Sequence, residues 1–163
     1  MVTSQSYNPR RSAPVIAKRS ASVIAIKGHP VYLMFGHFPI ACFTLTVLTD
    51  LAYWRTSNLL WHDFSAWLLL AGLVMGGIEL LVLLIDVIWS PSLRATGLGW
   101  VVVLGLLIVL LLGTWNSFVH ARDGWPGVVP WGLTLSVVTF LVMIITAWFG
   151  REMAIRSTNA GRI

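Results

Sequence analysis

Residues Phe64–Trp89 read FSAWLLLAGLVMGGIELLVLLIDVIW, and this segment decides the fold. Among its residues only Glu79 and Asp86 carry a charge. The hydrocarbon core of a bilayer is about 30 Å thick, and a helix needs about 20 mostly apolar residues to cross it. The segment therefore predicts a transmembrane helix.

Three further stretches meet the same criterion, and they are Val31–Trp54, Gly97–Val119 and Val128–Phe149. The joins between the four stretches are short and contain charges, prolines or glycines. Because short joins favour antiparallel neighbours, we expect an all-α integral membrane protein with four transmembrane helices in an up-down-up-down bundle. The predicted transmembrane domain covers residues 29–150, with a flexible basic cytoplasmic arm at 1–28 and a cytoplasmic C-terminal tail at 151–163.

The composition of the chain fits a surface that faces lipid. Of the 163 residues, 57% are hydrophobic and 10% are charged, whereas soluble domains carry about 25% charged residues. The net charge of +5 does not indicate nucleic-acid binding, because the basic residues cluster towards the ends of the chain and form no stripe interleaved with aromatics. The single Cys42 excludes an internal disulfide and a thiolate metal site, and we predict no metal centre.

Lysine and arginine are distributed unevenly between the two sides of the predicted bundle. Nine lie on the side of the termini and the second join, and only Arg55 and Arg122 lie on the other side. The positive-inside rule places the nine in the cytoplasm. We therefore predict that both termini are cytoplasmic. The nine tryptophans fall near the predicted span ends, where indole rings prefer to lie.

Ionisable side chains inside the predicted spans are candidates for a functional site. Glu79 and Asp86 are seven residues apart and share one helix face. Gly72 and Gly76 lie on that face too, in a small-xxx-small step that permits close helix packing. His37 is expected at a similar depth, and we predict that it lies within the bundle and within hydrogen-bonding or water-bridged reach of Glu79 or Asp86. Whether the carboxylates make structural hydrogen bonds or form a proton or ligand site stays open at this stage.

A second group of polar residues gathers at the opposite ends of the spans. It comprises Asp50, Arg55, His62, Asp63, Asn116, His120, Arg122 and Asp123. His62 opens the second span and His120 closes the third, and these ends meet in an antiparallel pair. A two-histidine site is therefore geometrically allowed, and the alternative is a pair of solvated loop histidines.

Two motifs near the first span point to a known family. They are Gly28-His29-Pro30 and Gly36-His37-Phe38-Pro39-Ile40, followed by Asp50 and by the later run Asp123–Pro130. In these residues the chain resembles the small four-helix bacterial membrane proteins of domain of unknown function 2231, over about residues 28 to 155. Where that family often has a second His-Pro pair, this chain has Tyr32-Leu33. The resemblance implies a bacterial inner-membrane location. It also implies a link to redox proteins, since domains of this family can be joined to cytochrome c-like domains, but it implies no established activity.

Three functions are compatible with these features. The first is an accessory or scaffolding subunit of a larger respiratory or photosynthetic complex, with other subunits or further copies of this chain as partners. The second is a haem b electron carrier between quinone and a cytochrome, which needs histidines on facing helices. The third is an oligomeric proton or ion pathway through His37, Glu79 and Asp86. The chain has no phosphate-binding loop and no HExxH motif, so we predict no catalytic residues and favour a subunit without a cofactor.

Overall fold

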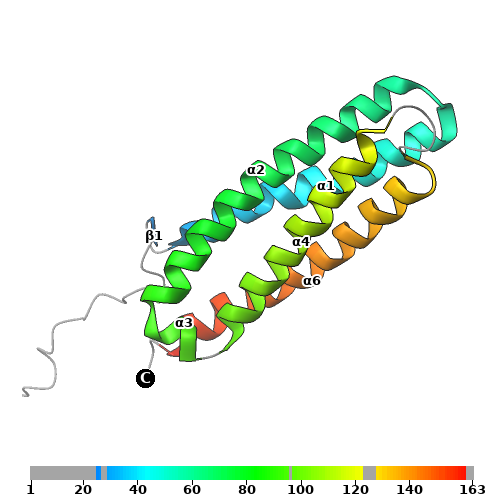
Figure 1. Ribbon diagram of the computed structural model, residues 1–163. Helices are drawn as coiled ribbons and strands as arrows, with labels where there is room; N and C mark the ends of the chain where they lie inside the picture. The colour runs from blue at the N-terminus through cyan, green and yellow to red at the C-terminus, as the bar shows by residue number, and fades with distance from the viewer. Residues whose placement is uncertain (1–24, 27–28, 96, 123–127, 161–163) are drawn as a thin grey trace, which may run out of the picture.

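The computed structural model describes residues 25–26, 29–95, 97–122 and 128–160. In this part of the chain, four long helices form an elongated bundle (Figure 1), and they are α1 (Val31–Thr56), α2 (Leu59–Trp89), α4 (Leu98–His120) and α6 (Trp131–Ala160). All four are long and apolar enough to cross a membrane. The predicted all-α class with four transmembrane helices is confirmed.

Three short elements accompany the long helices. The helix α3 (Pro91–Ala95) lies between α2 and α4, and the two-residue strands β1 (Ala25–Ile26) and β2 (His29–Pro30) pair in an antiparallel manner. Strand β1, helix α3 and the last turns of α6 lie at the same end of the bundle (Figure 1). The predicted arm at 1–28 falls outside the described residues except for β1.

The four long helices form a closed ring in which α1 and α4 each pack against α2 and α6. Near the start of α1, Gly36 lies against Glu79 of α2. Further along α1, Phe43 lies against Gly72, which comes earlier in α2. These two helices therefore run in opposite directions, while the direction of each helix relative to a bilayer stays a prediction.

The turn between α1 and α2 is tighter than the sequence indicated. Helix α2 begins at Leu59, five residues before the predicted start of the span. Asn58 caps it, because its side chain accepts a hydrogen bond from the Leu60 N–H at 3.0 Å. Ser57, the residue before Asn58, has a φ of 52°, in the left-handed region of backbone conformation. This conformation reverses the direction of the chain between α1 and α2. As a result, His62 and Asp63 lie on the first turns of α2.

The far end of α6 also differs from the predicted span. The sequence predicted that the fourth span ends at Phe149, and the helix continues to Ala160. Arg156 and Glu152 form an ion pair in this extension at 2.8 Å. Most of the region predicted as a tail is therefore helical.

Each long helix buries one narrow stripe, in which buried residues recur every three or four positions. In α1 the stripe includes Gly36, Pro39, Phe43, Thr46, Asp50 and Tyr53. In α2 it comprises Ser65, Leu69, Gly72, Gly76, Glu79, Leu83 and Asp86, with Val87 beside it. This spacing is that of helices that pack side by side over their whole length.

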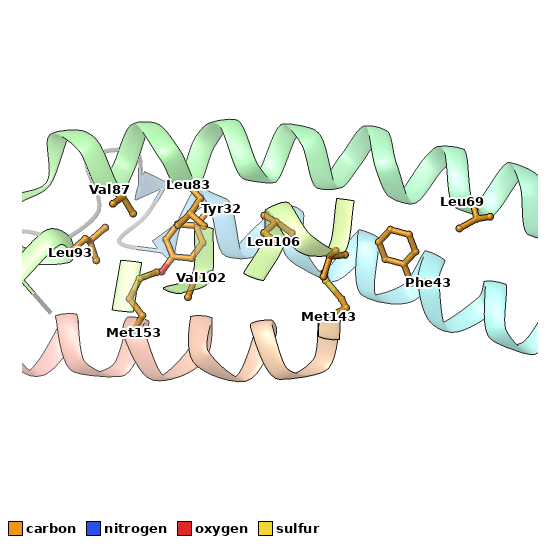
Figure 2. Packing of buried hydrophobic residues seen from close by; sticks show 11 residues of the cluster. Tyr32, Phe43, Leu69, Leu83, Val87, Leu93, Val102, Leu106, Met143 and Met153 are labelled. Carbon is orange, nitrogen blue, oxygen red and sulfur yellow. The ribbon is translucent and has the colours of Figure 1, made fainter. Parts of the chain in front are cut away.

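Large apolar side chains fill most of the interior. Figure 2 shows Tyr32, Leu83 and Val102 grouped towards one end, and Phe43 and Met143 nearer the middle of the bundle. The outer faces carry further large apolar side chains, and seven of the tryptophans are exposed: Trp54, Trp67, Trp89, Trp100, Trp115, Trp131 and Trp148. Because each helix carries apolar residues on its inner and its outer face, hydropathy does not separate the two faces. The inner stripe is distinguished from the outer face by its small and polar residues.

Candidate functional site: a carboxylate bound by all the long helices

Asp50 lies about two turns before the end of α1 and is fully buried. Ser65 of α2 donates a hydrogen bond to its Oδ1 at 2.5 Å. Ser136 of α6 donates to its Oδ2 at 2.5 Å. The Nε2 atom of His120, on α4, lies 3.0 Å from Oδ1. One carboxylate therefore connects all four long helices at a single level, and we call these four residues the Asp50 cluster.

The partners of Asp50 are themselves held by a further set of hydrogen bonds. Asn116 Nδ2 donates to Ser136 Oγ at 2.8 Å, and His120 Nδ1 lies 3.1 Å from the Asn116 backbone oxygen. Thr49 Oγ1 lies 2.7 Å from Ser65 Oγ. A buried carboxylate costs several kcal/mol unless it is paired and hydrogen-bonded. In the Asp50 cluster, hydrogen-bond partners from three other helices stabilise the carboxylate and so offset this cost.

His62 covers the Asp50 cluster on the side of the turn between α1 and α2. Its ring stacks on that of His120, with the centroids 5.8 Å apart and the planes at 26°. Tyr53 packs against it at 5.9 Å, with the rings tilted. The Nδ1 atom of His62 lies 3.6 Å from Oδ1 of Asp63, whose side chain is 71% exposed. The structure thus brings together the two histidines for which the sequence allowed a pair.

A haem b would need a free ring nitrogen from each of two histidines. His120 meets Asp50 with one ring nitrogen and the Asn116 backbone oxygen with the other. As arranged, the His62–His120 pair does not fit the ligands of a haem iron. In the described part of the chain, no group of three or more His, Cys, Asp or Glu residues is arranged to hold a metal ion.

A second buried polar group surrounds Glu79 and Asp86 on α2. Gly36 approaches so closely that a Cβ at this position would lie 2.6 Å from Glu79 Oε1. Tyr32 of α1 is also buried. Gly36 and Asp50 are 14 residues apart on α1, which corresponds to about 21 Å along the helix axis. The bundle therefore contains two separate polar levels.

His37 does not join either level. Its side chain is exposed on the outside of α1, and its Nδ1 lies 2.7 Å from the backbone oxygen of Leu33. The prediction that His37 lies within the bundle and pairs with Glu79 or Asp86 is wrong. Gly36 occupies the stripe position that faces α2, and each following residue in a helix is rotated by about 100°. That rotation places the His37 side chain on the outer surface.

Ser65, Ser136 and the central role of Asp50 were not predicted from the sequence. Asp50 was placed only in the polar group at the opposite ends of the spans, whereas it lies inside α1, which continues to Thr56. A signal was present in α2, where Gly72, Glu79 and Asp86 are spaced by seven residues. One further step of seven towards the N-terminus reaches Ser65, so the same spacing leads to the partner of Asp50.

Comparison with known proteins supports the membrane character of the chain. The family described as "Predicted membrane protein (DUF2231)" matches residues 28–159, which include α1, α2, α4 and nearly all of α6. No curated protein and no solved structure matches the chain. Because the family match covers most of the sequence, including both polar levels, the chain belongs to the DUF2231 family of predicted membrane proteins.

Proposed function

We propose that this protein is a non-catalytic accessory subunit of a larger complex of the bacterial inner membrane, respiratory or photosynthetic, and that a neighbouring subunit packs on the face of α1 around His37. The outward position of His37 carries the proposal. The residue lies six positions after the start of α1, or about 9 Å along the helix. Ionisable residues in transmembrane segments are expensive and almost always face protein or water rather than lipid.

The surroundings of His37 suit a neighbouring helix. Met34 and Phe38 are exposed beside it, and Ala41 is exposed one turn further along α1. Small residues such as alanine allow two helix backbones to approach closely, and a histidine can hydrogen-bond across the contact. We therefore assign to this face a transmembrane helix that carries a polar side chain opposite His37.

Exposed hydroxyl groups elsewhere on the bundle differ from His37, whose Nδ1 meets the Leu33 backbone oxygen but whose Nε2 has no hydrogen-bond partner among the described residues. Thr114 of α4 is exposed, and its Oγ1 donates a hydrogen bond to the backbone oxygen of Leu110 at 2.7 Å. Its polar group is therefore satisfied within its own helix. This makes Thr114→Val a matched control for a substitution at His37, since both remove a polar group from the outer surface.

We expect His37→Leu to release the neighbouring subunit while leaving the bundle folded. Native gels of membranes solubilised in mild detergent should show the wild type and Thr114→Val in a larger assembly, and His37→Leu at the size of the free chain. Thermal unfolding of the two variants should stay within about 0.5 kcal/mol of the wild type, as is usual for exposed positions. A wild-type chain that migrates alone, or a His37→Leu chain that keeps its partner, would contradict the proposal. A Soret band that stays with the isolated chain would instead favour the haem alternative.

We also propose that both ends of the chain face the cytoplasm. The basic residues support this assignment, because α3, which carries Arg94, and the last turns of α6, which carry Arg151 and Arg156, lie at the same end of the bundle as β1 (Figure 1). A fluorescent reporter that folds only in the cytoplasm should be active when fused after Ile163. A periplasmic alkaline phosphatase fused at the same place should be inactive. The reverse pattern would overturn the assignment.

A further inference from the structure

The hydrogen-bond partners of His120 determine how many protons the Asp50 cluster holds. A backbone carbonyl can only accept, so Nδ1, which lies 3.1 Å from the Asn116 oxygen, must carry a hydrogen. The other nitrogen, Nε2, lies 3.0 Å from Oδ1 of Asp50. A second hydrogen must lie between these two atoms, because a bare nitrogen and a bare carboxylate oxygen would repel each other.

This second hydrogen is a proton taken from solution. It makes the pair either an imidazolium beside a carboxylate or a neutral imidazole beside a carboxylic acid, and in both cases the net charge is zero. The hydroxyls of Ser65 and Ser136 donate to the same carboxyl group and bring no charge. A buried site of low dielectric favours such neutrality, since loss of the proton would leave a negative charge in the bundle.

A route for this proton leads towards the exposed end of the cluster. His62 stacks on His120, and its Nδ1 faces Asp63, a largely exposed carboxylate. The other ring nitrogen of His62, Nε2, is buried and has no hydrogen-bond partner among the described residues. An unpaired buried nitrogen beside a protonated pair is suited to receive a proton or to bind a water molecule that passes one on.

On the opposite side of the cluster the interior carries the hydroxyls of Thr46 and Thr139 and otherwise mainly apolar side chains. Phe43, Leu106 and Met143 are buried in the middle of the bundle (Figure 2). The next ionisable side chain along the buried stripe of α2 is Glu79, 14 residues from Ser65 or about 21 Å along the helix. This distance is many times that of a single proton transfer between hydrogen-bonded groups.

We propose that Asp50 and His120 form a proton-binding site that exchanges its proton with one face of the membrane through His62. The ionisable groups around it are Tyr53 on α1, His62 and Asp63 on α2, and none on the described part of α6 nearby, where Ser136 and Thr139 face inwards. Arg55 and Arg122 are exposed and do not face the pair. The site takes up a proton from water at its open end and does not pass it across the membrane.

The first experiment counts the protons. Full-length protein with ¹⁵N-labelled histidine is placed in lipid nanodiscs, and the ring nitrogens are observed by NMR at neutral pH. The chain has four histidines, so His29→Gln, His37→Gln and His62→Phe identify three signals and leave that of His120. We expect one of two results. Either both ring nitrogens of His120 carry a proton, or one does and the infrared spectrum shows a carboxylic-acid band that shifts when aspartate is isotope-labelled. A His120 ring with one proton and no such band would overturn the site.

The second experiment tests the route. After transfer to D₂O, deuterium should reach the His120 ring about ten times more slowly in His62→Phe than in the wild type, because exchange would then require local opening of the bundle. Phenylalanine keeps an aromatic ring against His120 and removes both nitrogens. His29→Phe is the matched control and should exchange at the wild-type rate, since His29 lies on β2, before the start of α1 and at the end of the bundle away from the Asp50 cluster. Equal rates in His62→Phe and the wild type would overturn the route through His62.

Discussion

Asp50→Ala is expected to destabilise the folded bundle by about 3–5 kcal/mol, the range found when one partner of a buried ion pair is removed. The substitution takes away the acceptor for Ser65 and Ser136 and the partner of His120, and all three side chains are buried. Each would be left without its hydrogen bond in the interior of the bundle. The loss also acts on every long helix, because the four residues of the Asp50 cluster come from four different helices.

Unfolding of the purified protein in detergent, followed by circular dichroism, measures this effect. Asp63→Ala is the matched control, since it also removes an aspartate near the same end of the bundle, from a side chain that is 71% exposed. We expect the control to change the free energy of unfolding by less than about 0.5 kcal/mol. If both variants unfold together with the wild type, the Asp50 cluster does not hold the helices together.

Gly76→Leu is expected to have the second-largest effect, a loss of about 3 kcal/mol from overpacking. A Cβ at position 76 would lie 2.9 Å from Leu110 Cδ2 on α4 and 3.6 Å from Pro39 Cγ on α1. The remaining atoms of a leucine side chain would force α2 away from both neighbours. The small-residue step at Gly72 and Gly76 therefore serves packing within one chain.

The neighbouring glycine provides the control for this prediction. A Cβ at Gly77 would meet no atom within 4 Å, so Gly77→Leu adds the same side chain to the same turn without a clash. We expect it to unfold at or slightly above the wild-type midpoint, because leucine favours a helix by up to about 1 kcal/mol over glycine. Equal destabilisation by the two variants would show that the length of the side chain, and not its position, causes the effect.

The sequence by itself determined the membrane character, the four helices and the buried face of α2. Crossing a bilayer depends on the length and apolar composition of a segment, which can be read directly from the residues. The face of α2 follows from the seven-residue spacing of Gly72, Glu79 and Asp86, since two helical turns return a side chain to nearly the same side. These properties belong to a single helix and need no knowledge of its neighbours.

The ends of the helices were harder to locate. The charged and polar residues between Arg55 and Asp63 indicated a longer join than the turn at Ser57 and Asn58. Capping by the Asn58 side chain allows α2 to begin early in spite of that polarity. The earlier start places His62 on a helix with a fixed orientation, and this is the condition for its stacking on His120.

Only the tertiary structure decided which polar residues meet. His37 and Gly36 are adjacent in sequence, yet one faces outwards and the other lies against Glu79, because a helix turns by about 100° per residue. Asp50 and Ser136 are 86 residues apart and meet because α1 and α6 pack at a particular relative height. Apolar residues cover both sides of these helices, so hydropathy does not fix their rotation or height. Close packing at the glycines and hydrogen bonding at Asp50 fix both, and these interactions exist only once the four helices have assembled.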